Sequence, residues 1–257
     1  MFNLNYPAGL GGVNWTGWKI IVFSNRAMKF AIMADVHANL EAFQVVLDDA
    51  KEQQCTQYVF LGDFVGYCAD PKACLDIIRA MKVPCVRGNH DDYCAADVTP
   101  AGLNPAAARA IDWTRRQLAE DDRQWLRNLP HVCTVEGFTI VHATLESPEC
   151  WQYIFDRMAA ITSLARQSTQ VCFYGHTHVP LAFVRDTAIW GGTYTKFKIE
   201  SGKQYLVNPG AVGQPRDGSP KTAYAIYDLD EGSVELRRLP YDFATTQRKI
   251  REAGYAG

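Results

Sequence analysis

The sequence predicts an α/β fold of the mixed α+β kind, and three observations support this class. From Lys29 onwards, short apolar runs that end in a polar residue alternate with stretches of helical periodicity, which is typical of β-α-β units around a parallel sheet. Beyond residue 180 the apolar runs are separated by turns such as Gly191-Gly192 and Ser201-Gly202, so we expect antiparallel hairpins that form a second sheet. With 47% hydrophobic and 21% charged residues, the chain has the composition of an ordinary globular protein.

The first part of the chain contains two strand-and-helix units and a third apolar run. A strand is expected over 29–35, and the apolar residues between 40 and 50 recur at the spacing of one helix face. A second strand over 58–63 is followed by a helix that begins near Pro71, because proline is favoured in a first turn. The third strand-like run covers 85–90 and also ends in polar residues.

The middle of the chain is predicted to be mostly helical. Residues 92–129 form a helical excursion, in which Asn104 caps a helix that Pro105 begins. Strands follow over 138–142 and 171–176, and a helix is expected between them. This helix has an apolar face that we expect to pack into the core rather than contact a ligand, and the face carries Trp151, Ile154, Phe155, Met158 and Ile161.

We expect one domain over residues 28–257, which closes with a helix over 242–253, and an N-terminal extension over residues 1–27. The extension lacks the long apolar region and basic start of a signal peptide. The sequence contains no run of 18 apolar residues, so no transmembrane helix is expected. The eight cysteines form no C-x-x-C pair and several lie in apolar runs, so they are interpreted as buried thiols in a reducing compartment. These features predict a cytoplasmic protein with no membrane partner.

The charge pattern limits the class of ligand. The net charge is −2 with both signs interspersed, so the basic stripe of a duplex nucleic-acid binder is missing. An anionic substrate would therefore be held by a local site and not by the whole surface.

Histidine and aspartate recur where apolar runs end. Because the carboxyl ends of parallel strands meet at one edge of a sheet, we expect these side chains to converge. Histidine and carboxylate together suit Mn, Fe, Zn or Ni better than Ca or Mg. Seven ligands are too many for one tetrahedral ion but suit two ions that share a carboxylate. A lone residue of this kind is more often a turn or cap, yet the whole set in order predicts a metal site. The set consists of Asp35, His37, Asp63, His90, His142, His176 and His178.

Five short motifs in this order resemble the calcineurin-like metallophosphoesterase family over about residues 28–228. They are Asp35-Val-His37, Gly62-Asp63, Gly88-Asn89-His90-Asp91, Val141-His142 and Gly175-His176-Thr-His178. Two further segments, 62–67 and 208–217, resemble the prokaryotic small phosphodiesterase branch, whose members are often labelled as resembling diadenosine tetraphosphatase.

The resemblance implies a fold and a reaction centre. The fold is a four-layer α/β/β/α sandwich of two facing mixed β-sheets flanked by helices. One metal ion would be held by Asp35, His37 and His178, the other by Asn89, His142 and His176, and Asp63 would bridge them. Manganese is the expected metal, with Fe, Zn or Ni as alternatives, and a metal-bridging hydroxide would attack phosphorus. His90 would act outside the metal shell, either on the phosphate or on the leaving oxygen.

Departures from the family pattern narrow the substrate. Phosphoprotein phosphatases carry Asp-Arg where this chain has Gly66-Tyr67, so the phosphate clamp and the carboxylate that orients His90 are absent at these positions. Asp91 or Asp92 is an alternative partner for His90. The expected substrate is a phosphodiester of a small or nucleotide-like compound. Alternatives are a phosphomonoesterase or protein phosphatase, or a non-catalytic scaffold such as the retromer subunit that shares this fold.

Residues outside the motifs receive weaker assignments. Tyr153 falls off the apolar helix face and is a candidate for ligand contact. Arg87 and Arg216 are candidates for phosphate contact, since the arginine fork matches phosphate oxygens, although surface charge is the default interpretation for both. His131 is interpreted as structural or surface-exposed. The metal-binding histidine segment reads His142-Ala-Thr instead of the family's His-Gly-Ser.

Overall fold

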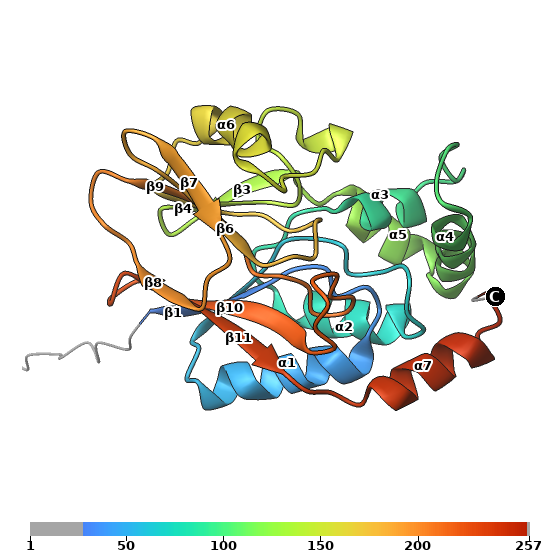
Figure 1. The fold of residues 1–257 in the computed structure, drawn as a ribbon. Helices are drawn as coiled ribbons and strands as arrows, with labels where there is room; N and C mark the ends of the chain where they lie inside the picture. Colours follow the sequence, from blue (N-terminus) through green and yellow to red (C-terminus); the bar gives the residue numbers. More distant parts are fainter. Residues whose placement is uncertain (1–27, 256–257) are drawn as a thin grey trace, which may run out of the picture.

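The computed structural model describes residues 28–255, which fold into two β-sheets packed face to face with helices on both outer sides (Figure 1). This arrangement confirms the predicted mixed α/β class and the four-layer sandwich. The predicted extension over residues 1–27 lies outside the described residues.

The first sheet has five strands in the order β2-β1-β10-β11-β8. β1 is parallel to β2 and antiparallel to β10, and Ile32 of β1 lies opposite Val59 and Ala225. β1 is therefore an interior strand, with one neighbour close to it in the sequence and one almost 200 residues later. The strands are β1 (Lys29–Met33), β2 (Gln57–Phe60), β8 (Lys196–Lys198), β10 (Thr222–Asp228) and β11 (Ser233–Leu239).

The second sheet has six strands in the order β3-β4-β5-β9-β6-β7. β4, β5 and β9 run parallel to one another, while the pairs β3–β4, β9–β6 and β6–β7 are antiparallel. The strands are β3 (Val132–Val135), β4 (Phe138–Val141), β5 (Val171–Phe173), β6 (Leu181–Arg185), β7 (Ile189–Gly192) and β9 (Gln204–Asn208).

The helices form the two outer layers and one end of the molecule (Figure 1). Against the first sheet lie α1 (Leu40–Glu52) and α2 (Pro71–Met81), and α7 (Phe243–Glu252) packs against α1. Against the second sheet lies α6 (Arg157–Arg166). At one end of the sandwich α3 (Asn89–Ala95), α4 (Pro105–Gln117) and α5 (Glu120–Arg127) pack together. The predicted starts of α2 at Pro71 and of α4 after the Asn104 cap are confirmed.

The alternation of side chains along β1 shows why the layers stack in this way. Phe30 and Ile32 point into the core between the sheets, whereas Ala31 and Met33 point into the core beneath the helices. The Phe30 ring meets Phe138 of the facing sheet edge to face at 5.1 Å. Since both faces of β1 are buried, the strand is apolar throughout, and each large side chain buried here contributes about 1.5–3 kcal/mol.

Two predicted strand features are wrong. The hairpins beyond residue 180 do not form a second sheet of their own, because β10 and β11 extend the first sheet while β6, β7 and β9 join β4 and β5. The run 85–90 is not a strand. Only Cys85 forms a bridge, to Phe60, and Asn89 and His90 lie in the first turn of α3.

The predicted helix with an apolar face from Trp151 to Ile161 is also wrong in its first half. Trp151 adopts a left-handed conformation with φ 53°, and α6 begins only at Arg157, where the Asp156 side chain caps it by accepting the amide hydrogen of Ala159. The predicted face is split as a result. Ile154 is buried, whereas three of the other apolar residues, Phe155, Met158 and Ile161, are exposed.

The cysteines and helices agree with the sequence interpretation. All eight cysteines lie within the described residues as free thiols, and six of them are buried. Among residues 28–255, no helix is both long and apolar enough to cross a membrane.

Candidate metal centre

The predicted ligands lie in the loops that leave the carboxyl ends of four strands, and the structure brings them together. Asp35 and His37 follow β1, Asp63 follows β2, His142 follows β4, and His176 and His178 follow β5. These six side chains form two groups of ligand atoms, each within 4.8 Å, and Asp63 belongs to both groups. Asn89 completes the set, since its Oδ1 lies 3.2 Å from Nε2 of His142. All seven residues are buried.

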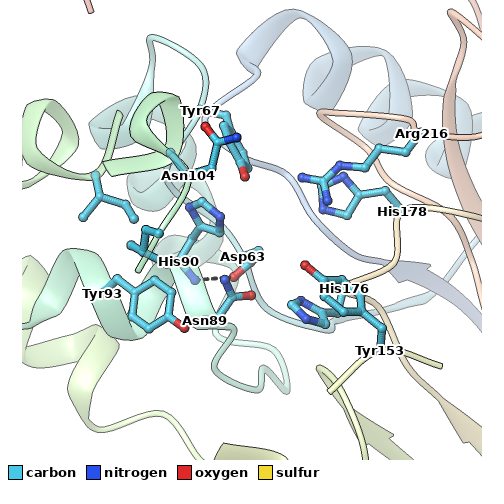
Figure 2. Close-up of a pocket in the computed structure, with 13 residues that line it drawn as sticks. Asp63, Tyr67, Asn89, His90, Tyr93, Asn104, Tyr153, His176, His178 and Arg216 are labelled. Atoms are coloured by element: carbon cyan, nitrogen blue, oxygen red, sulfur yellow. Dashed lines mark hydrogen bonds between the residues drawn. The ribbon is translucent and has the colours of Figure 1, made fainter. Parts of the chain in front are cut away.

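Asp63 occupies the midpoint between the two groups. Its Oδ2 lies 3.5 Å from Nε2 of His37 in one group and 3.4 Å from Nε2 of His142 in the other. Its Oδ1 accepts the backbone N–H of His90 at 2.8 Å (Figure 2). In the first group, Oδ1 of Asp35 lies 3.4 Å from Nε2 of His178. One carboxylate oxygen therefore faces both groups, as a bridging ligand would.

The backbone at the centre is strained. Non-glycine residues seldom adopt positive φ, and each such residue costs on the order of 1–3 kcal/mol that the surrounding structure must offset. Strain of this kind is common at functional sites. Here five of the seven predicted ligands have positive φ, between 47° and 67°. They are Asp35, His37, Asp63, His176 and His178.

Backbone carbonyls fix which nitrogen of each imidazole faces the centre. The Nδ1 atoms of His37, His142 and His178 lie 3.1, 2.7 and 2.6 Å from the carbonyl oxygens of Val65, Leu61 and Gln214, to which each donates. In the neutral form of each ring, Nε2 is then left with a lone pair. The His176 ring has the opposite orientation to these three. Its Nε2 donates to the carbonyl of Trp151 at 2.8 Å, which leaves Nδ1 to face the centre. Such partners orient metal-binding histidines and raise their basicity as ligands.

The histidines fit a bound cation. Burial keeps the pKa values of His37 and His178 well below the usual range and lowers the pKa of His176 to about 3. These rings are therefore neutral at neutral pH, the form that binds a metal. The Nε2 atoms of His37 and His178 lie only 3.1 Å apart. Two facing lone pairs at that distance repel unless a cation accepts both.

The carboxylates fit a cation as well. Burial, with the negative charge of Asp63 nearby, raises the pKa of Asp35 to about 7. Burial also raises the pKa of Asp63, but the charges of His142 and His90 lower it by more and hold it well below its usual value. Burial lowers the pKa of His142, yet Asp63 reverses this and raises it to about 9. Two buried carboxylates this close need compensating positive charge.

Asp91 supports the centre, but not in the predicted way. Neither it nor Asp92 orients His90. The Asp91 carboxylate accepts the backbone N–H groups of Gly88, Asp63 and Phe64 at 3.0, 2.8 and 2.8 Å. Asp92 instead pairs with Arg87 at 3.1 Å. Asp91 therefore fixes the loop that carries Asp63, a role that its place inside a motif did not reveal.

His90 is held by packing. Its ring lies 4.4 Å from the Tyr67 ring and meets the His37 ring edge to face at 4.8 Å. Its Nδ1 is buried and has no hydrogen-bond partner among the described residues. Aromatic neighbours, and not a carboxylate, therefore position this ring.

Asn208 is a structural support that the sequence interpretation missed. The segment Asn208-Pro-Gly is expected to be a turn, and Asn208 Oδ1 does accept the N–H of Gly210. Its Nδ2 also donates to the carbonyl of Gly175 at 2.7 Å and to Oγ1 of Thr177 at 3.0 Å. The side chain thus pins the loop that carries His176 and His178. No local pattern distinguishes this asparagine from an ordinary turn residue.

A pocket of about 150 Å³ opens above the centre (Figure 2). Its floor includes Asp63, Asn89, His90, His176 and His178, and its walls carry tyrosines and apolar residues of the α3 and α4 region. Tyr153 lines it as well and stacks on the His176 ring at 4.1 Å, which places this candidate ligand contact beside the centre. The remaining lining residues are Tyr67, Tyr93, Leu103, Asn104, Ala107, Ile111 and Arg216.

The two candidate phosphate-binding arginines differ. Arg216 lines the pocket, but Arg87 does not. Arg87 donates to the backbone carbonyl of Arg127 at 3.2 Å and to Nε2 of His131 at 2.8 Å. His131 is half-buried, meets the Trp151 ring at 5.5 Å and does not line the pocket.

Comparison with known proteins gives a consistent result. Residues 28–232 match the calcineurin-like phosphoesterase superfamily domain. An uncharacterized protein of Methanocaldococcus jannaschii is 33% identical over 227 residues, which cover 86% of this chain and 90% of that protein. A metallophosphoesterase from Sphaerobacter thermophilus has a similar structure, with a TM-score of 0.79, 38% identity, and coverage of 89% of this chain and 94% of that one. A hypothetical protein from Pyrococcus horikoshii shares the fold, with a TM-score of 0.72, 18% identity and coverage of 87% and 92%.

Proposed function

The chain belongs to the calcineurin-like phosphoesterase superfamily, and on this premise we propose that it is a two-metal phosphodiesterase for small or nucleotide-like substrates. The observation that carries the proposal is the pair of ligand groups that share Asp63 beneath a pocket. One ion position would use Asp35, His37 and His178, and the other Asn89, His142 and His176. We propose manganese as the metal, since a mixed set of imidazoles and carboxylates accepts it.

Each part of the pocket has a separate task in this proposal. Two cations bound here would lower the pKa of a water between them and offset charge on the phosphate. Asp63 holds both positions at a fixed separation, and the backbone carbonyls behind the histidines keep each ring aligned. His90, which lines the pocket, is proposed as the catalytic group that contacts the phosphate or the leaving oxygen.

The wall of the pocket fits an esterifying group. Tyr93, Leu103 and Ile111 line one side of the pocket and offer apolar contact to one organic substituent of the substrate. Because the pocket is small, we propose that it holds the phosphoryl group and one compact substituent, and that the second substituent of a diester extends out of the pocket.

The test compares two aryl esters. Protein loaded with Mn²⁺ should hydrolyse bis(p-nitrophenyl) phosphate faster than p-nitrophenyl phosphate, and Asp63→Asn should lower the rate by at least about 10³-fold, since it removes the shared ligand. Asp48→Asn, an exposed aspartate on α1, is the control and should retain activity. Faster hydrolysis of the monoester would favour the phosphomonoesterase alternative, and full activity of the Asp63 variant would refute the two-metal arrangement.

A further inference from the structure

We propose that Arg216, on the loop between β9 and β10, is the residue that clamps the substrate's phosphate beside the metal centre. The inference rests on the proposed phosphoesterase function and adds a specificity-determining residue to it. The sequence makes Arg216 a candidate for phosphate contact, and its surroundings in the structure carry the assignment.

Arg216 is the single cationic side chain among the described residues that line the pocket. Figure 2 shows it beside His178, with its guanidinium directed across the pocket mouth towards Tyr67. The guanidinium carbon lies 5.6 Å from the centre of the Tyr67 ring. An anion that enters the pocket therefore passes one guanidinium before it reaches the metal ligands.

The guanidinium is tethered but not neutralised. Its Nε and Nη2 donate to Oε1 of Gln214 at 3.2 and 2.7 Å. Within residues 28–255, no carboxylate lies within ion-pair distance of it. Arginine has five N–H donors in a planar fork that matches two phosphate oxygens. Gln214 and the Tyr67 hydroxyl use some of these donors, and the remaining ones are left for an anion.

The backbone of this loop is tied to the metal centre itself. Gly213 donates its N–H to the carbonyl of Asp35 at 2.8 Å, and Arg216 donates its N–H to the carbonyl of His178 at 3.3 Å. His178 in turn donates from Nδ1 to the Gln214 carbonyl at 2.6 Å. A loop bonded to two predicted ligands keeps the guanidinium at a set distance from any ion they hold. Such fixed placement is what a phosphate-positioning residue requires.

Tyr67 helps to hold Arg216 in place. The face of the Tyr67 ring supports the Arg216 guanidinium by a cation–π contact. Positive charge reaches the pocket mouth from the loop after β9 instead of from the loop after β2. Arg87, which points away to Asp92 and His131, does not supply it.

The first experiment needs no turnover. Calorimetric titration of Mn²⁺-loaded protein with inorganic phosphate should show saturable binding, and Arg216→Met should weaken it by about 10- to 100-fold, the loss expected for charge-assisted hydrogen bonds. Arg216→Lys should recover part of the affinity, because it restores the charge without the fork. Arg116→Met, which removes the same charge from an exposed position on α4, should bind as the wild type does. Equal affinity in the Met variant, or no saturable binding by the wild type, overturns the proposal.

The second experiment separates this role from a structural one. Arg216→Met should raise KM for the aryl diester by about tenfold while manganese content and melting temperature stay at wild-type values, since Arg216 is not a ligand. Loss of manganese in this variant would assign Arg216 to the integrity of the centre and overturn the clamp. If the wild type binds phosphate through Arg216 but cleaves neither ester, the clamp stands and the proposed phosphodiesterase activity falls.

Discussion

The His90 imidazole fills the space that a side chain at Gly66 would need. A β-carbon built on Gly66 would lie 2.5 Å from Nδ1 of His90, closer than such atoms approach. Gly66 also has φ +85°, a conformation that other residues seldom adopt. The absence of a side chain at Gly66 therefore sets where the His90 ring lies. Among the described residues, no carboxylate bonds to Nδ1 of this ring.

Gly66→Ala should consequently impair catalysis without removing the metals. The methyl group displaces the His90 ring, and loss of a positioned acid or hydrogen-bond donor lowers kcat by about 100-fold. Steady-state kinetics on the aryl diester, together with metal analysis, checks both halves of this expectation. Gly137→Ala is the matched control, because Gly137 has the same φ of +85° but no atom within 4 Å of the added carbon. Unchanged kcat in the Gly66 variant would show that His90 has no catalytic role.

Metal binding should stabilise the fold. Asp35 and Asp63 are fully buried, at 0% and 1% exposure, and a cation relieves their mutual repulsion. At a Mn²⁺ concentration 100 times the dissociation constant, binding contributes about 2.7 kcal/mol, which for a domain of this size raises Tm by roughly 5–10 °C. Thermal unfolding with Mn²⁺ and with chelator measures the difference. In Asp63→Asn most of this shift should disappear, and an equal shift there would place the stabilising ion elsewhere.

Acid should weaken the tie between α1 and the first sheet. Arg237 holds Asp49 with two hydrogen bonds of 2.9 and 3.1 Å, and the Tyr224 hydroxyl donates a third at 2.6 Å. Burial raises the pKa of Asp49, but these bonds outweigh it and keep the pKa below the usual 3.8. Because the pKa of Asp49 is lower in the folded protein than in the unfolded chain, the ionised carboxylate stabilises the fold above about pH 4. This stabilisation is lost as the pH falls through the pKa of Asp49 in the folded protein.

Asp49→Asn should therefore cost about 1.5–3 kcal/mol in unfolding free energy at about pH 7. The difference from wild type should shrink below about pH 4, where the wild-type carboxylate also takes up a proton. Urea unfolding of both proteins at each pH gives the comparison, and loss of metal in acid affects both alike. Asp48→Asn on the exposed neighbour should show neither effect. A cost that stays constant down to about pH 3 would contradict the assigned pKa.

Tyr153 should contribute to binding more than to turnover. Its ring stacks on His176 within the pocket wall and is half exposed. Tyr153→Leu removes a flat surface worth about 0.5–1.5 kcal/mol to an aromatic group, so KM for the aryl diester should rise roughly 2- to 10-fold with little change in kcat. Phe243→Leu, an equally exposed ring on α7, is the control. A fall in kcat alone would instead indicate that Tyr153 holds His176 in place.

The positions of the candidate ligands could be predicted because the signal is local. Asp35, Asp63, His142 and His176 each follow an apolar strand within a few residues, and parallel strands bring their carboxyl ends to one edge. The starts of α2 and α4 could also be predicted, since each helix has a proline in its first turn. The ligand positions and these two helix starts were predicted correctly because each depends on residues that are close together in the sequence.

Features that depend on distant contacts could not be predicted. The partner of β1 lies at Thr222–Asp228, and nothing in either strand names the other. The stripe from Trp151 to Ile161 has helical spacing, but the Trp151 carbonyl accepts from His176, so the chain around it is bound to the loop of another strand instead of forming a helix. Asp91 and Asn208 act on loops far away in sequence for the same reason.

The place of β1 in its sheet has a consequence for how the protein is made. β1 leaves the ribosome before β10, and its edge opposite β2 stays unpaired until β10 has been synthesised about 190 residues later. At 5–20 residues per second that interval is roughly 10–40 s. During it an apolar strand edge is open to pairing with other nascent chains. Chaperone capture of the emerging chain, or slow expression at low temperature, should therefore raise the yield of folded protein.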